Sequence, residues 1–233
     1  MKHSISKSEQ TPTVLEMTDV VKKFGSKHTE VDALKGISIT VHAGEFVSIV
    51  GPSGSGKSTF LTIAGGLQNA TSGTVLLNGA DWSALSEHKR SRARFESLGF
   101  ILQGSNLVPF LRISEQFAFL DHLRKKVIPT NLDQLLTSLD IDDLRHKYPK
   151  ELSGGERERV AIAKALYNDP SLILADEPTA SLDSEHAFDV VKLLAEQAHS
   201  RQKAIVMVTH DERMTAWSDT TYRMRDGELV KAA

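Results

Sequence analysis

Hydrophobic and polar residues alternate in the first part of the chain and then give way to apolar runs. Val14–Phe24 and Ile37–Val41 alternate with the period that is typical of half-buried antiparallel strands. Phe46–Val50 is a continuous apolar run that ends at a glycine-rich loop, which predicts a strand buried on both faces. Thr74–Gly79 is predicted to be another short strand, closed by an Asn-Gly turn.

The middle of the chain changes to helical spacing. It predicts helices at Glu87–Ser97, Ile113–Lys126 and Asn131–Asp140. Glycine and proline are sparse over this region. We therefore interpret residues from Gly104 to about Ala165 as a mostly helical subdomain that is inserted into an α/β core.

The last third of the chain alternates between strands and helices. Ser171–Asp176 and Ala204–His210 are apolar strands, and an amphipathic helix, Ser184–Ser200, lies between them. Strands that alternate with helices predict a parallel sheet wrapped by helices. The fold class is therefore α/β.

Composition limits the classes of function. A chain of 233 residues with 40% hydrophobic and 25% charged residues fits one globular domain, expected at residues 13–233 after a disordered tail, 1–12. The net charge of −2 gives no basic field for nucleic acid, and the lack of cysteine excludes disulfides and thiolate metal sites. No apolar run reaches the roughly 18 residues of a membrane span, so we expect no direct membrane insertion.

The loop after the buried strand carries the clearest chemistry. Gly51–Ser58 satisfies the pattern G-x-x-x-x-G-K-[ST], and a helical stretch from Ser58 to about Gly65 follows it. Glycines let successive N–H groups converge on phosphate oxygens, and the helix start adds its dipole. We expect Lys57 to bridge the β- and γ-phosphates of a nucleotide and Ser58 to offer its hydroxyl to Mg²⁺. The expected nucleotide contacts are Gly51, Ser53, Gly54, Ser55, Gly56, Lys57, Ser58 and Thr59.

Polar residues at the ends of other strands would complete a hydrolytic site. Asp176 and Glu177 close an apolar strand, where Asp176 can hold Mg²⁺ and Glu177 can polarise the attacking water. His210 ends the next strand and could bond the γ-phosphate. Gln103 follows a further short strand, and its amide could ligate Mg²⁺ and sense the γ-phosphate. Taken alone, a carboxylate pair at a strand end is commonly only solvated, a single histidine is usually structural or exposed, and a glutamine in a loop indicates nothing.

A second glycine cradle opens another predicted helix. Residues 151–160 read "ELSGGERERV", so Ser153, Gly154 and Gly155 precede a helix at Glu156–Tyr167. One nucleotide needs one cradle. This turn therefore caps its helix, or it serves a phosphate on another molecule.

Taken together and in this order, the motifs resemble those of the nucleotide-binding subunit of an ABC transporter, over about Val14 to Val230. The resemblance implies the ABC ATPase fold: a P-loop NTPase (RecA-like) parallel-sheet core, an N-terminal antiparallel β subdomain and an inserted helical subdomain. It also implies hydrolysis of ATP to ADP and phosphate with Mg²⁺. The motifs that carry it are Phe24, Gly51–Thr59, Gln103, Leu152–Glu156, Leu172–Pro178, Ser181–Asp183 and His210.

The family resemblance gives the second cradle a ligand. In such proteins two copies pack head to tail, and each ATP lies between one copy's phosphate loop and the other's signature turn, which Ser153–Gly155 would form in this chain. Asp183 would contact the opposite subunit, and Phe24 would stack on adenine unless it is a strand core residue. Glu158 stands where relatives commonly have Gln, a departure that leaves the nucleotide contacts intact. The residues that would meet the partner's ATP are Ser153, Gly154, Gly155 and Glu156.

A finer resemblance concerns the type of transporter. Thr62–Leu67, Ser97–Leu111 and Ile173–Asp183 are similar to the macrolide-exporter and lipoprotein-releasing group, and most of all to its haem-exporter branch from Gram-positive bacteria. The resemblance implies a subunit on the cytoplasmic face of the bacterial membrane that powers a separate permease. The apolar segment Gly104–Phe119 could form a groove for that permease, or it could pack within the helical subdomain.

Other functions fit part of the same pattern. The exported substrate could be an antimicrobial peptide, a macrolide or a lipoprotein instead of haem. The chain could also be a soluble ABC ATPase that acts on chromosomes, DNA repair or ribosomes, although it has no coiled-coil insertion and no basic footprint. A nucleotide-gated regulatory scaffold is a further alternative.

Overall fold

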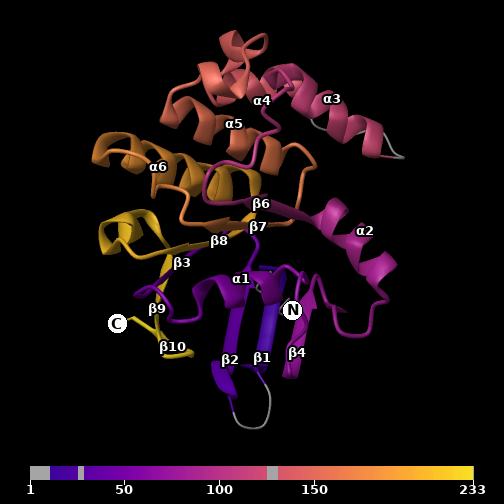
Figure 1. The fold of residues 1–233 in the computed structure, drawn as a ribbon, viewed down its shortest axis with the longest axis vertical. Coiled ribbons are helices and arrows are strands. Elements are labelled where there is room, and N and C mark those ends of the chain that lie inside the picture. The colour runs from indigo at the N-terminus through magenta and orange to yellow at the C-terminus, as the bar shows by residue number, and fades with distance from the viewer. Residues whose placement is uncertain (1–10, 26–28, 125–130, 233) are drawn as a thin grey trace, which may run out of the picture.

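A computed structural model describes residues 11–25, 29–124 and 131–232 (Figure 1). The predicted disordered tail, 1–12, lies almost entirely outside the described residues. The N-terminal part forms an antiparallel sheet in the order β2-β1-β4-β5. Its strands are β1 (Thr13–Phe24), β2 (Val31–His42), β4 (Ser72–Leu77) and β5 (Ala80–Asp81).

A second sheet forms the core, in the order β10-β9-β3-β8-β7-β6. Its neighbours pair in parallel except for the antiparallel edge strand β10. Every residue of β3 and β8 is buried, which confirms the prediction from the apolar runs. The strands are β3 (Phe46–Val50), β6 (Leu98–Ile101), β7 (Leu172–Asp176), β8 (Ala204–Thr209), β9 (Thr220–Arg225) and β10 (Glu228–Lys231).

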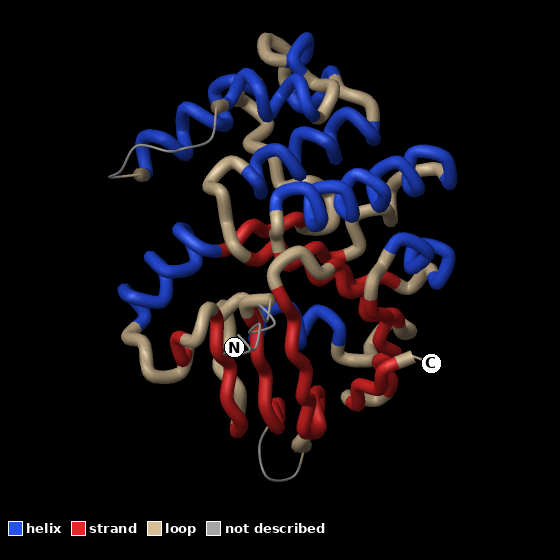
Figure 2. Tube along the Cα trace, turned by 180° about the vertical axis from the view of Figure 1, so that it is seen from behind, coloured by secondary structure: helices blue, strands red, loops and turns tan. Residues whose placement is uncertain are grey.

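Alternate residues of the core strands enter two hydrophobic clusters on opposite faces of the core sheet. Ile173 and Ala175 of β7 pack in one cluster with the helices α3, α5 and α6, whereas Leu172 and Leu174 pack in the other with α1 and the N-terminal sheet. Figure 2 shows the N-terminal sheet at the bottom, strands of the core sheet across the middle and the helices of the middle segment at the top. The helices α1 (Lys57–Ala64), α2 (Glu87–Ser97) and α6 (Ser184–Arg201) connect the strands.

The middle segment is less helical than the sequence suggests. Residues 104–112 form a loop, because Gly104, Ser105 and Asn106 all have positive φ, between 43° and 85°, which is incompatible with a helix. Gln116 holds the loop: its amide donates to the carbonyl oxygens of Val108 (2.8 Å) and Leu111 (3.1 Å). The helical elements are α3 (Ile113–Leu123), α4 (Leu132–Ser138), η1 (Asp142–Leu144), η2 (Pro149–Glu151) and α5 (Gly154–Leu166).

Several predicted boundaries are wrong by a few residues. The helix predicted to begin at Glu156 begins at Gly154, and α3 ends at Leu123; the predicted end, Lys126, is outside the described residues. The predicted strand Thr74–Gly79 ends at Leu77, because Asn78 and Gly79 turn with φ of 49° and 76°. No helix in the described ranges is long and apolar enough to cross a membrane.

Glu158 is a buried carboxylic acid on α5. Its side chain is 3% exposed, and its Oε1 atom has no hydrogen-bond partner. Burial raises the pKa of Glu158 to about 7. Because an unfolded chain would ionise this group near its ordinary pKa of 4.5, the folded state holds the proton more tightly. Its contribution to stability is therefore full below pH 4.5 and is lost as the pH rises to about 7.

Replacing Glu158 by glutamine is expected to stabilise the protein by an amount that grows as the pH rises from 4.5 to about 7. The amide keeps the shape and cannot ionise, so the gain in unfolding free energy should reach about 3 kcal/mol at about pH 8 and vanish at about pH 4.5. Urea unfolding of both proteins at several pH values measures it. Glu196→Gln, at an exposed position on α6, is the matched control. An equal gain at every pH would contradict the ionisation of a buried carboxyl.

Candidate functional site

The phosphate loop joins the end of β3 to α1, and its backbone geometry requires glycine. A Cβ atom added at Gly51 would lie 2.1 Å from the carbonyl oxygen of Met224, and one at Gly56 would lie 2.6 Å from that of Ala33. Gly54 and Gly56 have φ of 80° and 110°, which disfavour any side chain. The motif glycines are therefore needed for this loop to fold against the neighbouring strands.

Lys57 is buried at the base of the loop, with 7% of its side chain exposed. Its Nζ donates hydrogen bonds to the carbonyl oxygens of Gly51 (2.7 Å) and Pro52 (3.1 Å). The same nitrogen lies 3.8 Å from Oε1 of Glu177. An ammonium group is thus held inside the loop, with one carboxylate beside it as counter-charge.

Glu177 follows β7 in a constrained conformation. Its φ is 48°, a left-handed value that is uncommon for a residue other than glycine. Its Oε2 lies 2.9 Å from Nδ1 of His210 and accepts a hydrogen bond of 3.2 Å from the His210 backbone N–H. The carboxylate is 13% exposed and the imidazole 61% exposed. Glu177 is therefore fixed between Lys57 and His210, with His210 toward solvent.

Asp176 is harder to ionise than an ordinary aspartate. Partial burial, and next the negative charge of Glu177, raise its pKa, whereas a hydrogen bond from Ser58 and the charge of Lys57 oppose the rise. A cation placed beside Asp176 would favour the ionised form. The carboxylate and the Ser58 hydroxyl together offer hard oxygen ligands.

One cavity of about 310 Å³ brings half of the predicted site residues together. Gln103 reaches it from the end of β6, and Asp176 and Glu177 reach it from the end of β7, so these two strand ends share one space with the loop that follows β3. Within the described ranges no three His, Cys, Asp or Glu residues cluster as a metal site. Mg²⁺ suits such a site, because it commonly takes few protein ligands and completes its shell with phosphate and water oxygens. The lining residues are Ser53, Gly54, Gly56, Lys57, Ser58, Thr59, Gln103, Asp176 and Glu177.

The second cradle is the first turn of α5 and lies outside that cavity. Ser153 is the N-cap: its hydroxyl accepts from the Glu156 backbone N–H (3.2 Å), and its own N–H donates to the Glu156 carboxylate (2.7 Å). The backbone hydrogen bond from Ser153, despite some burial, holds the pKa of Glu156 below its usual value. Ser153 and Gly154 are exposed, and none of Ser153, Gly154, Gly155 and Glu156 lines the cavity.

Five further predicted residues do not line the cavity: Phe24, Gly51, Ser55, Asp183 and His210. Phe24 ends β1 with 41% of its surface exposed, so the alternative of a strand core residue is wrong. The ammonium of Lys22 lies 5.1 Å from the centre of the Phe24 ring. Asp183 is the exposed N-cap of α6 and is bonded to His186, a residue that the sequence argument missed. The acid–histidine spacing at a helix start was the available signal.

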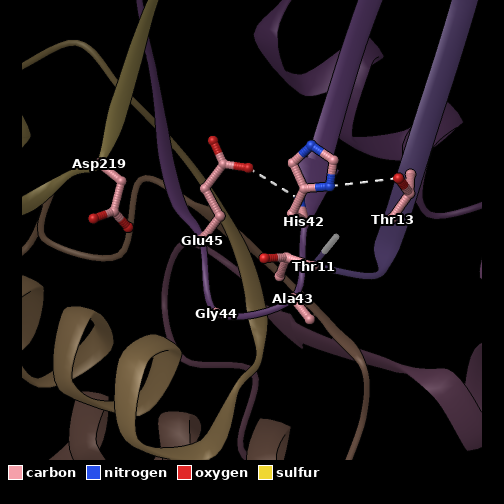
Figure 3. A pocket seen from close by; sticks show the side chains of 7 residues that line it. All are labelled: Thr11, Thr13, His42, Ala43, Gly44, Glu45 and Asp219. Atoms are coloured by element: carbon pink, nitrogen blue, oxygen red, sulfur yellow. Dashed lines mark hydrogen bonds between the residues drawn. The ribbon is translucent and has the colours of Figure 1, made fainter. Parts of the chain in front are cut away.

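A larger cavity, of about 560 Å³, is a separate feature (Figure 3). It lies where β3 and β9 begin, whereas the phosphate loop follows the other end of β3. Its carboxylates are already engaged: Glu45 accepts from His42 and Thr220, and Asp219 accepts from the Phe46 backbone and bonds His199. These hydrogen bonds account for both carboxylates as structural groups, so no ligand is needed to explain them.

Comparison with known proteins supports this assembly of motifs. Residues 34–180 match the family model described as "ABC transporter". The chain is 44% identical over 219 residues to the "Putative hemin import ATP-binding protein HrtA" of Staphylococcus aureus (strain Newman), covering 93% of this chain and 99% of the relative.

Solved structures agree in fold. MJ0796, described as a dimeric bacterial ABC transporter cassette, has a TM-score of 0.82 at 32% identity, covering 93% of this chain and 98% of its own. The same cassette is known in a post-hydrolysis state with ADP and Pi, with a TM-score of 0.81. CbiO1 of Clostridium perfringens has a TM-score of 0.82 at 26% identity, covering 94% of this chain and 87% of its own. The chain therefore belongs to the ABC transporter family, as an ATP-binding subunit that hydrolyses ATP.

Proposed function

We propose that two copies of this chain form a head-to-tail dimer that hydrolyses Mg²⁺-bound ATP and powers a separate membrane permease for haem export. The observation that carries the proposal is the separation of the two phosphate cradles. The loop at Gly51–Ser58 shares a cavity with Asp176 and Glu177, whereas Ser153–Gly155 begins α5 outside it. A second cradle that lies outside its own chain's cavity fits the site of a partner. The dimeric state described for MJ0796 supports this reading.

The proposed chemistry assigns each residue of the cavity a task. The loop N–H groups and Lys57 bind the β- and γ-phosphates, and Glu177 accepts a proton from the attacking water. His210, bonded to Glu177, orients that carboxylate and reaches the γ-phosphate. Ser58, Asp176 and Gln103 would hold Mg²⁺, whose charge offsets that of the phosphates. Phe24 stacks on the adenine from the end of β1.

The apolar segment after Gln103 is the proposed contact with the permease. Of the side chains expected to form a groove, Leu107 packs on the core, Val108 and Leu111 are half-buried, and Phe110 is 76% exposed. Phe119 adds a second exposed ring from α3, at 48%. Phe110 is therefore the anchor that a partner helix would bury, contributing about 1.5–3 kcal/mol if it is fully covered.

The proposed export is opposite in direction to the import named for the relatives. HrtA of Staphylococcus aureus is described as a putative hemin import protein, which supports haem as the cargo and places import as the competing direction. The export proposal rests on the resemblance of Ser97–Leu111 and Ile173–Asp183 to the macrolide-exporter group. Both directions need the same ATPase, so the measurement must follow haem itself.

Cells that express this chain with its permease are expected to hold less haem than cells that express the permease alone. Phe110→Ser should abolish the difference and weaken co-purification with the permease about tenfold or more, because the anchor is lost. Val230→Ser, another exposed apolar residue (64%) but on β10, is the matched control and should behave as the wild type. A rise in cell haem would indicate import. A chain that captures no membrane protein would favour the soluble-ATPase alternative.

A further inference from the structure

His186 connects the two parts of the chain that are expected to face a partner. It lies in the first turn of α6, where its backbone N–H donates to Oδ1 of Asp183 (3.1 Å) and its Nδ1 lies 2.9 Å from both carboxylate oxygens. The imidazole also lies against the signature turn of α5, since a Cβ atom added at Gly155 would meet its Cδ2 atom at 3.1 Å. One side chain thus contacts both α6 and α5.

The surrounding charges favour a protonated imidazole. The hydrogen bond to Asp183, and then the charges of Asp183, Glu185 and Asp189, raise the pKa of His186, and the same hydrogen bond lowers the pKa of Asp183. On α5, Arg159 extends an Nη1 atom to within 3.9 Å of the same added Cβ atom at Gly155.

Neighbouring η3 (Glu212–Trp217) and its N-cap, Asp211, supply further charges. Its Arg213 lies 3.4 Å from the Ser184 hydroxyl and is paired with Asp211. The Asp183 and His186 side chains are 67% and 52% exposed, so an ion pair between them adds little to the stability of one chain. The pair instead fixes the positions of the two side chains relative to each other.

We propose that His186 is a positioning residue that locks the Asp183 carboxylate against the signature turn, so that both meet the partner's nucleotide site in one fixed arrangement. This inference rests on the proposed head-to-tail dimer. An unrestrained Asp183 would have to be ordered when two chains associate, and that loss of freedom opposes binding. The contact with Gly155 places the imidazole on the first turn of α5, whose free N–H groups would receive the partner's phosphate.

The test uses full-length chains that carry Glu177→Gln, which slows hydrolysis, and measures the ATP concentration for half-maximal dimerisation by sedimentation. His186→Ala should raise that concentration about three- to tenfold, because Asp183 loses its partner. His186→Asn should restore most of the affinity, because its amide can replace the Nδ1–H donor. Binding of a fluorescent ATP analogue to the monomer should be unchanged, since His186 is outside the phosphate-loop cavity.

The pH dependence distinguishes this role from simple helix capping. A raised pKa means that the charged clamp is full at or below the ordinary pKa of 6.5 and weakens as the pH rises through the raised value. At about pH 6 the Glu177→Gln chain that keeps His186 should therefore dimerise at a lower ATP concentration than the chain that also carries His186→Asn. This difference should be lost at about pH 8.5. Asp176 and His210 are present in both proteins, so the difference reports His186.

The outcomes separate this inference from the dimer itself. If Glu177→Gln alone does not dimerise with ATP, the proposed head-to-tail assembly fails. If it dimerises and His186→Ala dimerises equally well at every pH, the positioning role is wrong. If His186→Ala unfolds, the test rests on His186→Asn. The inference is then overturned if the ratio of dimerisation affinities between the His186→Asn chain and the chain that keeps His186 is the same at every pH.

Discussion

Replacing Glu177 by glutamine is expected to lower the rate of ATP hydrolysis at least about a hundredfold and to trap two chains around bound ATP. Glutamine keeps the size of the side chain and can still accept from the His210 backbone, but it cannot take a proton from water. The left-handed φ of 48° at position 177 constrains glutamate and glutamine equally, so the local fold should survive. Removal of the charge also removes one cause of the raised pKa of Asp176, so binding of a cation there should be kept.

Phosphate release and sedimentation in the presence of Mg²⁺ and ATP measure the two effects. Adding Lys57→Ala to the same chain is the control: it removes the ammonium that lies 3.8 Å from Glu177 and should prevent both ATP binding and dimerisation. Normal turnover by a monomeric Glu177→Gln protein would show that another group activates the water. Normal turnover with a trapped dimer would separate Glu177 from the chemistry but leave the assembly intact.

The sequence predicted those parts of the fold that depend on local patterns. Phe46–Val50 is a strand because its apolar run must be buried, and Gly51–Ser58 follows with a glycine pattern that has few other uses. The meeting of Gln103, Asp176 and Glu177 with the loop followed from one rule, that parallel strands end at a shared edge. That rule needs no knowledge of side-chain contacts.

The features that the sequence did not reveal depend on tertiary pairing. Thr220–Arg225 reads "TTYRMR" with no clear period, and it becomes β9 because it pairs with β3. The loop at 104–112 depends on three consecutive positive φ angles, which apolar content does not disclose. The Glu177–His210 and Asp183–His186 bonds join residues whose types are visible but whose orientations are set by their neighbours.

Mixing two inactive variants is expected to restore ATP hydrolysis. Lys57→Ala disables the phosphate loop, and Gly154→Asp places a negative charge where the partner's γ-phosphate should lie. Gly154 is exposed at the first position of α5, where an acidic residue suits the helix dipole. An added Cβ atom would meet a flexible Leu182 methyl at 3.1 Å and the Ser181 carbonyl oxygen at an ordinary contact distance of 3.8 Å. Both variants should therefore fold, and each should be inactive alone.

Head-to-tail geometry determines what the mixture does. In a mixed dimer one composite site contains both defects, while the other contains the intact Lys57 loop of one chain and the intact Gly154 turn of its partner. Half of randomly exchanged dimers are mixed and each has one working site, so about a quarter of the wild-type rate should return. The control is a chain that carries both Lys57→Ala and Gly154→Asp. If the signature turn served its own chain's nucleotide, no mixture could recover activity, because every chain would still lack either its loop or its turn.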